Sequence, residues 1–334
     1  MPRLLDPLKV GSLELKNRIV MPPMHTGYAD AEGMVTEKLL KHYSDRASDL
    51  GLLIVEHSYV VPRGRVGPNQ LGSYSDDLIP GLTRLVETVH EKGTPIALQL
   101  NHGGGISHSG VTGSQPEAPS PVMHPNRGRE LPRELSYEDI EGVIDCFRDA
   151  ARRAQEAGFD AVEVHGAHGF LLGQFHSPAT NKRLDEYGGA LENRVRLSRR
   201  IVREIRRDLG PDYPLLLRIG AEDAPQYTGG LPLREGVEAA RMIASEGIDI
   251  VDVSGGLGGG RMEGLKGPGF FVPQAAAIKE AVDVPVIGVG GIKTAEEADN
   301  IIRSGRVDLV AIGRAYLREP RWASIAIEEL GRAS

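Results

Sequence analysis

Two histidines separated by two residues, His165 and His168, are the side chains of this 334-residue chain whose types and spacing best suit chemistry. They end the alternating apolar run 160–165, the pattern of a buried strand, and glycines stand beside both. A neutral imidazole donates one hydrogen bond, so two on one turn can hold a single carbonyl oxygen or another anionic acceptor. A pair satisfied by neighbouring backbone groups is the simpler alternative. Their place at the end of a strand favours the first interpretation.

Glycines and one arginine follow two later strand-like runs. Gly290 and Gly291 follow one run, and Gly313 and Arg314 follow the other. Glycines leave their backbone N–H groups uncovered, and an arginine adds a charged, bidentate donor. The pattern predicts a phosphate site, whereas glycines that merely allow tight turns are the alternative.

Gln99 and Arg218 stand near the ends of two further runs. A buried arginine requires an anionic partner. A reduced flavin ring, which carries negative charge near N1 and O2, is one such partner, and a carboxylate such as Glu163 is another. The Gln99 amide has both a donor and an acceptor, which suits the pyrimidine edge of the same ring.

Eight strand-like runs alternate with eight helical runs, which predicts an α/β fold, specifically a single (β/α)8 TIM barrel over residues 1–334. The predicted strands are 17–21, 52–55, 95–100, 160–165, 215–219, 248–253, 284–289 and 309–312. The predicted helices are 36–49, 80–92, 136–157, 191–209, 233–245, 272–281, 295–303 and 320–330. A β-hairpin is expected at 8–15, and the long loop 102–132 after the third strand is typical of a lid or substrate-binding loop. Such barrels carry their active sites at the carboxyl ends of the strands, where the residues above would meet.

Composition excludes several classes of protein. The formal net charge of −7, from 39 basic and 46 acidic residues, disfavours nucleic-acid binding. A single cysteine, Cys146, rules out an intramolecular disulfide framework and an iron–sulfur cluster held by the thiolates of this chain. No long apolar run or signal segment is visible, so a cytoplasmic protein without membrane contact is expected.

Several segments together resemble the Old Yellow Enzyme family of FMN-dependent NAD(P)H oxidoreductases, which includes ene-reductases. The matching segments are 17–24 (NRIVMPPM), 99–104 (QLNHGG), 165–169 (HGAHG), 185–189 (DEYGG), Gly290-Gly291 and Gly313-Arg314. They occur in the family's order and run almost from end to end of the chain.

The resemblance implies an FMN cofactor, NADH or NADPH as reductant, a small-molecule substrate and a homo-oligomer. It places the flavin against Pro22, Pro23, Met24, Gln99 and Arg218, and the phosphate at Gly290, Gly291, Gly313 and Arg314. It also implies that His165 and His168 bind the carbonyl of an enone above the flavin, in the manner of an oxyanion hole. Flavin N5 would then deliver hydride to the β-carbon. Since the chain has one cysteine and ends soon after its eighth helical run, we expect direct reduction by NAD(P)H.

Three positions depart from the family's pattern. Phe170 stands where relatives carry the tyrosine that protonates the α-carbon, so another source, such as Tyr28, a lid residue or water, would be needed. Tyr28 and Phe170 are also expected to contact substrate. His25 stands where relatives often carry cysteine or threonine near the flavin, and a histidine there would make the flavin's potential depend on pH. His57 stands where a small residue is common, beside the far side of the flavin.

Other functions remain open on the sequence alone. The same flavin barrel could oxidise amines, a reaction that needs no proton delivered to carbon and that Phe170 slightly favours. A metal-dependent hydrolase could use the five histidines near strand ends, namely His25, His57, His102, His165 and His168. A flavin-binding protein without catalytic activity is a further alternative.

Overall fold

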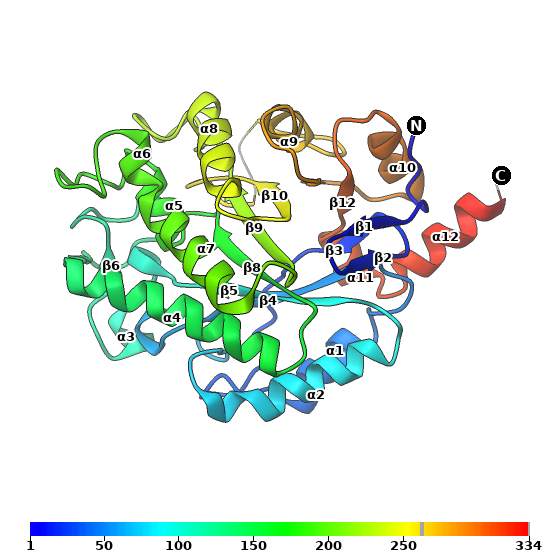
Figure 1. Ribbon diagram of the computed structural model, residues 1–334, viewed down its shortest axis with the longest axis horizontal. Coiled ribbons are helices and arrows are strands. Elements are labelled where there is room, and N and C mark those ends of the chain that lie inside the picture. Colours follow the sequence, from blue (N-terminus) through cyan, green and yellow to red (C-terminus); the bar gives the residue numbers. More distant parts are fainter. Residues whose placement is uncertain (261–263, 333–334) are drawn as a thin grey trace.

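The computed structural model describes residues 1–260 and 264–332, and eight parallel strands in it close into a barrel (Figure 1). The strands are β3 (Ile19–Met21), β4 (Leu52–Tyr59), β5 (Ile96–Asn101), β8 (Ala161–Gly166), β9 (Leu215–Gly220), β10 (Ile250–Ser254), β11 (Val286–Val289) and β12 (Leu309–Ala311). Each pairs with the next along the chain, and β12 pairs with β3 to close the ring. The predicted TIM barrel is therefore confirmed.

Eight helices follow the strands and surround the barrel (Figure 1). They are α1 (Glu37–Ser44), α2 (Ile79–His90), α4 (Tyr137–Glu156), α7 (Arg196–Leu209), α8 (Leu233–Ala244), α9 (Val272–Lys279), α10 (Ala295–Arg303) and α12 (Trp322–Arg332). Sequence signals explain where two of them begin. Ser136 with Asp139, and Thr294 with Glu297, form capping boxes that satisfy the first free N–H groups of α4 and α10.

Shorter elements decorate this frame. They are β1 (Leu8–Val10), β2 (Leu13–Leu15), β6 (Glu117–Ala118), β7 (Arg133–Glu134), α3 (Ser109–Thr112), α5 (Leu171–His176), α6 (Leu191–Arg194) and α11 (Arg314–Arg318). The pair β1–β2 is the predicted hairpin. The long loop after β5 contains α3 and β6, and β6 pairs with β7 just beyond it.

Alternation along the strands divides the apolar core into two layers. Leu53 and Val55 of β4 face the helices in the outer layer, whereas Leu52 and Ile54 face the barrel axis. Small residues such as Ala97 complete the inner layer, and the hairpin packs against it. Burial of both strand faces explains why the strands read as nearly continuous apolar runs.

Some predicted boundaries were wrong. β4 continues to Tyr59 instead of ending at residue 55, and its pairing with β5 shifts register between Val55 and Ser58. The predicted helix 191–209 is divided at Val195 into α6 and α7. The helices α5 and α11 are short segments that periodicity over a longer window does not reveal.

Buried histidines predict that the fold loses stability in acid. Burial lowers the pKa of His102 and of His176 to about 3. Their pKa in the unfolded chain is near the usual value, so below about pH 6.5 the unfolded state binds more protons than the folded state. We expect each histidine to remove roughly 1.4 kcal/mol of stability per pH unit between that point and its folded pKa. Thermal unfolding from pH 7.5 to 5 should show a falling Tm, and a constant or rising Tm would contradict this.

Candidate active site

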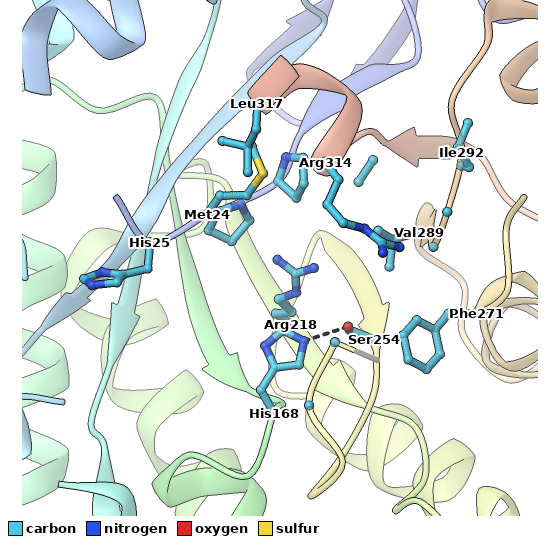
Figure 2. A pocket seen from close by; sticks show the side chains of 18 of the residues that line it. Met24, His25, His168, Arg218, Ser254, Phe271, Val289, Ile292, Arg314 and Leu317 are labelled. Atoms are coloured by element: carbon cyan, nitrogen blue, oxygen red, sulfur yellow. Dashed lines mark hydrogen bonds between the residues drawn. The ribbon is translucent and has the colours of Figure 1, made fainter. Parts of the chain in front are cut away.

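A cavity of about 810 Å³ opens at the carboxyl ends of the barrel strands and collects nearly all the residues predicted to form a site (Figure 2). The lining residues that were predicted are Pro22, Pro23, Met24, His25, His57, Gln99, His165, His168, Phe170, Arg218, Gly290, Gly291, Gly313 and Arg314. Residues from seven of the eight barrel strands, or from the loops after them, therefore meet where such barrels carry out chemistry.

The two imidazoles at the end of β8 lie close together and are neutral. Their ring centroids are 5.1 Å apart with an interplanar angle of 88°. Burial is the main cause that lowers the pKa of His165 and of His168 well below the usual value. The Ala167 N–H points at His165 Nδ1 at 3.3 Å, which leaves the ring proton on Nε2.

The turn that carries His168 has an unusual backbone. His168 has φ 59°, in the left-handed region that residues other than glycine rarely adopt, and its N–H donates to Gly255 O at 2.9 Å. Its Nε2 lies 2.7 Å from the hydroxyl of Ser254 at the end of β10, the contact drawn in Figure 2. When the hydroxyl donates, the His168 proton lies on Nδ1. Strained backbone of this kind clusters at functional sites.

Two further histidines line the cavity, His57 from the irregular part of β4 and His25 from the segment after β3. His57 Nδ1 lies 2.8 Å from Gln70 Nε2 and 3.3 Å from Asn101 Nδ2, both amide donors, so the His57 proton lies on Nε2. Burial lowers the pKa of His57 to about 3. His25 lies 5.2 Å from the His57 ring, and its Nδ1 is 2.9 Å from the buried carboxylate of Glu56.

Arg218 has a different carboxylate partner from the one considered in the sequence. Arg218 Nε lies 3.5 Å from Asp252 Oδ2, and this atom has no hydrogen-bond partner. The Arg218 residue is only 4% exposed. Glu163 instead accepts a hydrogen bond from Gln99 Nε2 at 2.7 Å. Burial, and then the charge of Asp252, raises the pKa of Glu163 well above its usual range. Burial therefore favours the protonated form of Glu163, and Asp252 is the carboxylate that pairs with Arg218.

The predicted phosphate residues lie at the other end of the cavity. Gly290 has φ 121° and Gly291 has φ 65°. A Cβ on Gly290 would lie 2.8 Å from the Phe270 ring, and a Cβ on Gly291 would lie 2.5 Å from the carbonyl oxygen of Gly267. Only glycine therefore fits this turn. Arg314 Cζ lies 5.9 Å from the centroid of the Phe270 ring, and in Figure 2 its side chain extends toward the strand end at Val289.

This arrangement fits a flavin mononucleotide. Arg218 lies in the middle of the view in Figure 2, between Met24 and His168, and is a buried cation with an unsatisfied donor. Arg314 and the glycines supply a second cationic end suited to a phosphate. The apolar residues that line the space between them suit a flat aromatic ring. They are Pro22, Pro23, Met24, Val289, Ala311 and Phe271.

Tyr28 is the one predicted site residue that the structure places outside the cavity lining. Lys38 Nζ lies 3.8 Å from the centroid of its ring, and the ring of His42 is 5.6 Å away. Its role in proton delivery and substrate binding stays a prediction.

Sequence reasoning missed several lining residues. Arg127 and Asn126 come from the long loop after β5, Ser254 from the end of β10, and Phe270 from the segment before α9. Ser254 could have been found from its place at a strand end. Asn126 and Arg127 lie in the loop 102–132 that was expected to contact substrate, but no periodicity singled out these two residues or Phe270.

Two further properties of the described residues bear on the alternatives. Within 1–260 and 264–332, no three His, Cys, Asp or Glu side chains group closely enough to hold a metal ion, so the five histidines do not converge as a ligand set. In the same ranges, no helix is both long enough and apolar enough to cross a membrane.

Comparisons with known proteins show the family of the chain. Residues 3–332 match the family model of the NADH:flavin oxidoreductase / NADH oxidase family. The chain is 42% identical to the NADH oxidase of Thermoanaerobacter brockii over 98% of its own length, but it spans only 51% of that protein. It is 38% identical to the NADPH dehydrogenase of Geobacillus thermodenitrificans, covering 98% of this chain and 94% of that one.

A solved structure shows the same fold. The Old Yellow Enzyme homologue from Zymomonas mobilis superposes with a TM-score of 0.87 at 30% identity, covering 98% of this chain and 93% of that one. Since the family model covers almost every residue and the barrel mouth fits a flavin mononucleotide, the chain belongs to the NADH:flavin oxidoreductase / NADH oxidase family and is an FMN-dependent NAD(P)H oxidoreductase of the Old Yellow Enzyme type.

Proposed function

We propose that this enzyme reduces carbon–carbon double bonds conjugated to a carbonyl group, and that residues 1–334 act as one FMN-binding barrel domain. The observation that carries the proposal is the neutral pair His165 and His168, whose ring donors lie beside the predicted flavin site. Neutral imidazoles bind an uncharged carbonyl and, more strongly, the enolate that develops from it.

The cavity residues divide into groups that would hold different parts of FMN. Gly290, Gly291, Gly313 and Arg314 would bind the phosphate, while Arg218 and Gln99 would contact the pyrimidine edge. When bound, FMN accepts hydride from NADH or NADPH and passes it to substrate. Because one N–H of Gln99 donates to Glu163, its carbonyl oxygen and its second N–H are the groups left to face the ring. His25 and His57 would lie beside the flavin and adjust its potential.

The imidazole pair supplies orientation and charge stabilisation. His165 Nε2–H and His168 Nδ1–H are the donors left free once Ala167 and Ser254 have bonded to the other ring nitrogens. Two fixed donors place the substrate carbonyl and lower the energy of negative charge on its oxygen. The hydrogen bond from Ser254 therefore sets which nitrogen of His168 can bind.

Phe170 cannot donate the proton that completes the reduction. It lines the cavity 4.9 Å from the His165 ring, measured between centroids. Water entering the mouth of the cavity is the proton source we propose, with Tyr28 or a residue of the long loop as alternatives. General-acid help is typically worth about 10²–10⁴-fold, so reduction of simple enones should be slow.

Anaerobic stopped-flow spectroscopy tests this proposal in two steps. NADH or NADPH is first used to bleach the flavin, and the reduced enzyme is then mixed with 2-cyclohexenone. Return of the flavin absorbance with formation of cyclohexanone supports the proposal. Failure of enones of any kind to reoxidise the flavin would refute it.

Amine oxidation is the second candidate function, and Phe170 is the observation that favours it. Removal of hydride from a carbon next to nitrogen requires no proton donor at that position. Bleaching of the oxidised flavin by a secondary amine, with no nicotinamide present, would support this function.

The arginine at the predicted phosphate site provides a test of cofactor binding. Replacing Arg314 with methionine keeps the apolar stem and removes the charge. We expect the Kd for FMN to rise about tenfold or more, because a charge-assisted bond to phosphate contributes roughly 1.5–3 kcal/mol. Fluorescence titration of the apoprotein with FMN measures this change. Arg321→Met, outside the cavity, serves as the control, and an unchanged Kd for the Arg314 variant would contradict the assignment.

A further inference from the structure

We propose that Arg127 binds an anionic group of the substrate, so that the preferred substrates are enones that also carry a carboxylate. The inference rests on the proposed function and names the substrate class of the same site. Arg127 comes from the long loop after β5 and lines the cavity above the imidazole pair.

Contacts with the turn that carries His168 fix the position of Arg127. Its Nη2 donates to the carbonyl oxygen of His168 at 2.6 Å, and its Cζ lies 4.8 Å from the centroid of the Phe170 ring. Phe170 in turn lies 4.9 Å from His165. The Arg127 guanidinium is therefore close enough to the two imidazole donors for one small substrate to contact both.

The loop around Arg127 is itself anchored to this turn. His124 is buried, and its Nδ1 accepts the backbone N–H groups of Arg127 at 3.1 Å and of Asn126 at 3.3 Å. A Cβ at Gly169 would come within 2.4 Å of His124 Nε2. Such close contact holds the loop against the residues after β8, so Arg127 is placed by packing and not only by its own hydrogen bond.

The charge of Arg127 is not balanced by the protein. Arg127 is exposed at the mouth of the cavity, and in the described ranges no carboxylate forms an ion pair with it within 4.0 Å. The cationic residues that line the cavity are Lys293, Arg127, Arg218, Arg314 and Arg318, and Glu319 is the one carboxylate among the described lining residues. Arg218 and Arg314 face the predicted flavin and its phosphate, and Lys293 and Arg318 follow the phosphate residues in the chain. Arg127 is left for the substrate.

The part of the cavity that would face the bound flavin consequently presents several hydrogen-bond donors. His57, His165, His168 and Arg127 present N–H groups there, and His57 is locked in this role because Gln70 and Asn101 both donate to its other nitrogen. A molecule with a carbonyl at one end and a carboxylate at the other complements these donors. A protonated amine does not, because it would meet a cation with no carboxylate nearby. The same feature therefore disfavours amine oxidation.

A matched pair of compounds tests the proposal with the FMN-loaded enzyme. (E)-4-Oxopent-2-enoate and its methyl ester share the conjugated ketone and differ in charge. Their Kd values for the oxidised enzyme are measured from the change in flavin absorbance, and their reoxidation rates by anaerobic stopped flow. The variants are Arg127→Met, Arg127→Lys and the control Arg129→Met, which removes an arginine of the same loop that does not line the cavity.

The expected result is a selective loss for the acid. Arg127→Met should raise the Kd of the acid about tenfold and change that of the ester less than about twofold, since a charge-assisted hydrogen bond is lost. Arg127→Lys should restore part of the difference, and Arg129→Met should change neither value.

Two outcomes would overturn the proposal. One is an equal change for acid and ester. The other is a slower reduction of the flavin by NADH or NADPH with an unchanged ratio of acid to ester, because Arg127 would then bind a phosphate of the nicotinamide cofactor. The ratio of the Kd values of acid and ester is measured on the oxidised enzyme and does not depend on turnover. If neither compound reoxidises the wild-type enzyme, ene reduction fails while the role of Arg127 is still decided by the Kd values.

Discussion

Replacing His165 with alanine is expected to slow reoxidation of the reduced enzyme by 2-cyclohexenone about 10²–10³-fold, the usual cost of removing one oxyanion donor. His165 is 2% exposed and neutral, and the Ala167 N–H leaves its Nε2–H as the free donor. Loss of that donor leaves His168 to stabilise the developing enolate alone. Anaerobic stopped flow at saturating enone measures the effect.

Two further variants separate this role from a structural one. His165→Asn keeps an N–H donor of similar reach and should recover part of the rate. His176→Gln alters a buried histidine of α5 that does not line the cavity, so it should change Tm more than the rate. The Kd for FMN should stay close to that of the wild type in each case. A His165→Ala enzyme that works within about threefold of the wild-type rate would exclude an oxyanion role for this residue.

Replacing Phe170 with tyrosine is expected to raise the rate of enone reduction, by up to about 10²-fold, because it adds a general acid beside the imidazole pair. The ring lies 4.9 Å from His165 and 5.1 Å from His57, so a hydroxyl on it would enter the cavity next to the bound carbonyl. The Arg127 guanidinium over the ring, 4.8 Å from its centroid, would stabilise the phenolate left after proton transfer.

The pH dependence and a second variant distinguish this effect from a general change in the cavity. With Phe170→Tyr, the rate should gain a new fall at alkaline pH as the phenol loses its proton. Phe170→Leu changes the same position without adding a proton donor, so it should neither raise the rate of enone reduction nor add this alkaline fall. If the Phe170→Tyr rate is equal to or below that of the wild type, protonation does not pass through this position.

The sequence predicted the fold and most of the site because both depend on local patterns. Alternating apolar runs separated by helical spacing predicted the eight strands and their order around the barrel. Residues at strand ends then had to meet at one face, which is why His168, Gln99 and Arg218 were found together.

Features set by contacts between strands could not be predicted in this way. The register shift in β4, which brings His57 to the cavity, depends on pairing with β5. The partner of Arg218 proved to be Asp252 of the neighbouring strand because side-chain direction decided between two nearby carboxylates. Arg127 lies in a loop without periodicity, and its position depends on packing against His124.

A crystal structure of the FMN-loaded enzyme soaked with 2-cyclohexenone tests the central claim most directly, namely that the imidazole pair after β8 binds the substrate carbonyl above the flavin. The account predicts that the carbonyl oxygen lies about 2.7–3.2 Å from both His165 Nε2 and His168 Nδ1, with the ring of the substrate over the isoalloxazine. A carbonyl bound elsewhere in the cavity, with both imidazoles left to other partners, would contradict it.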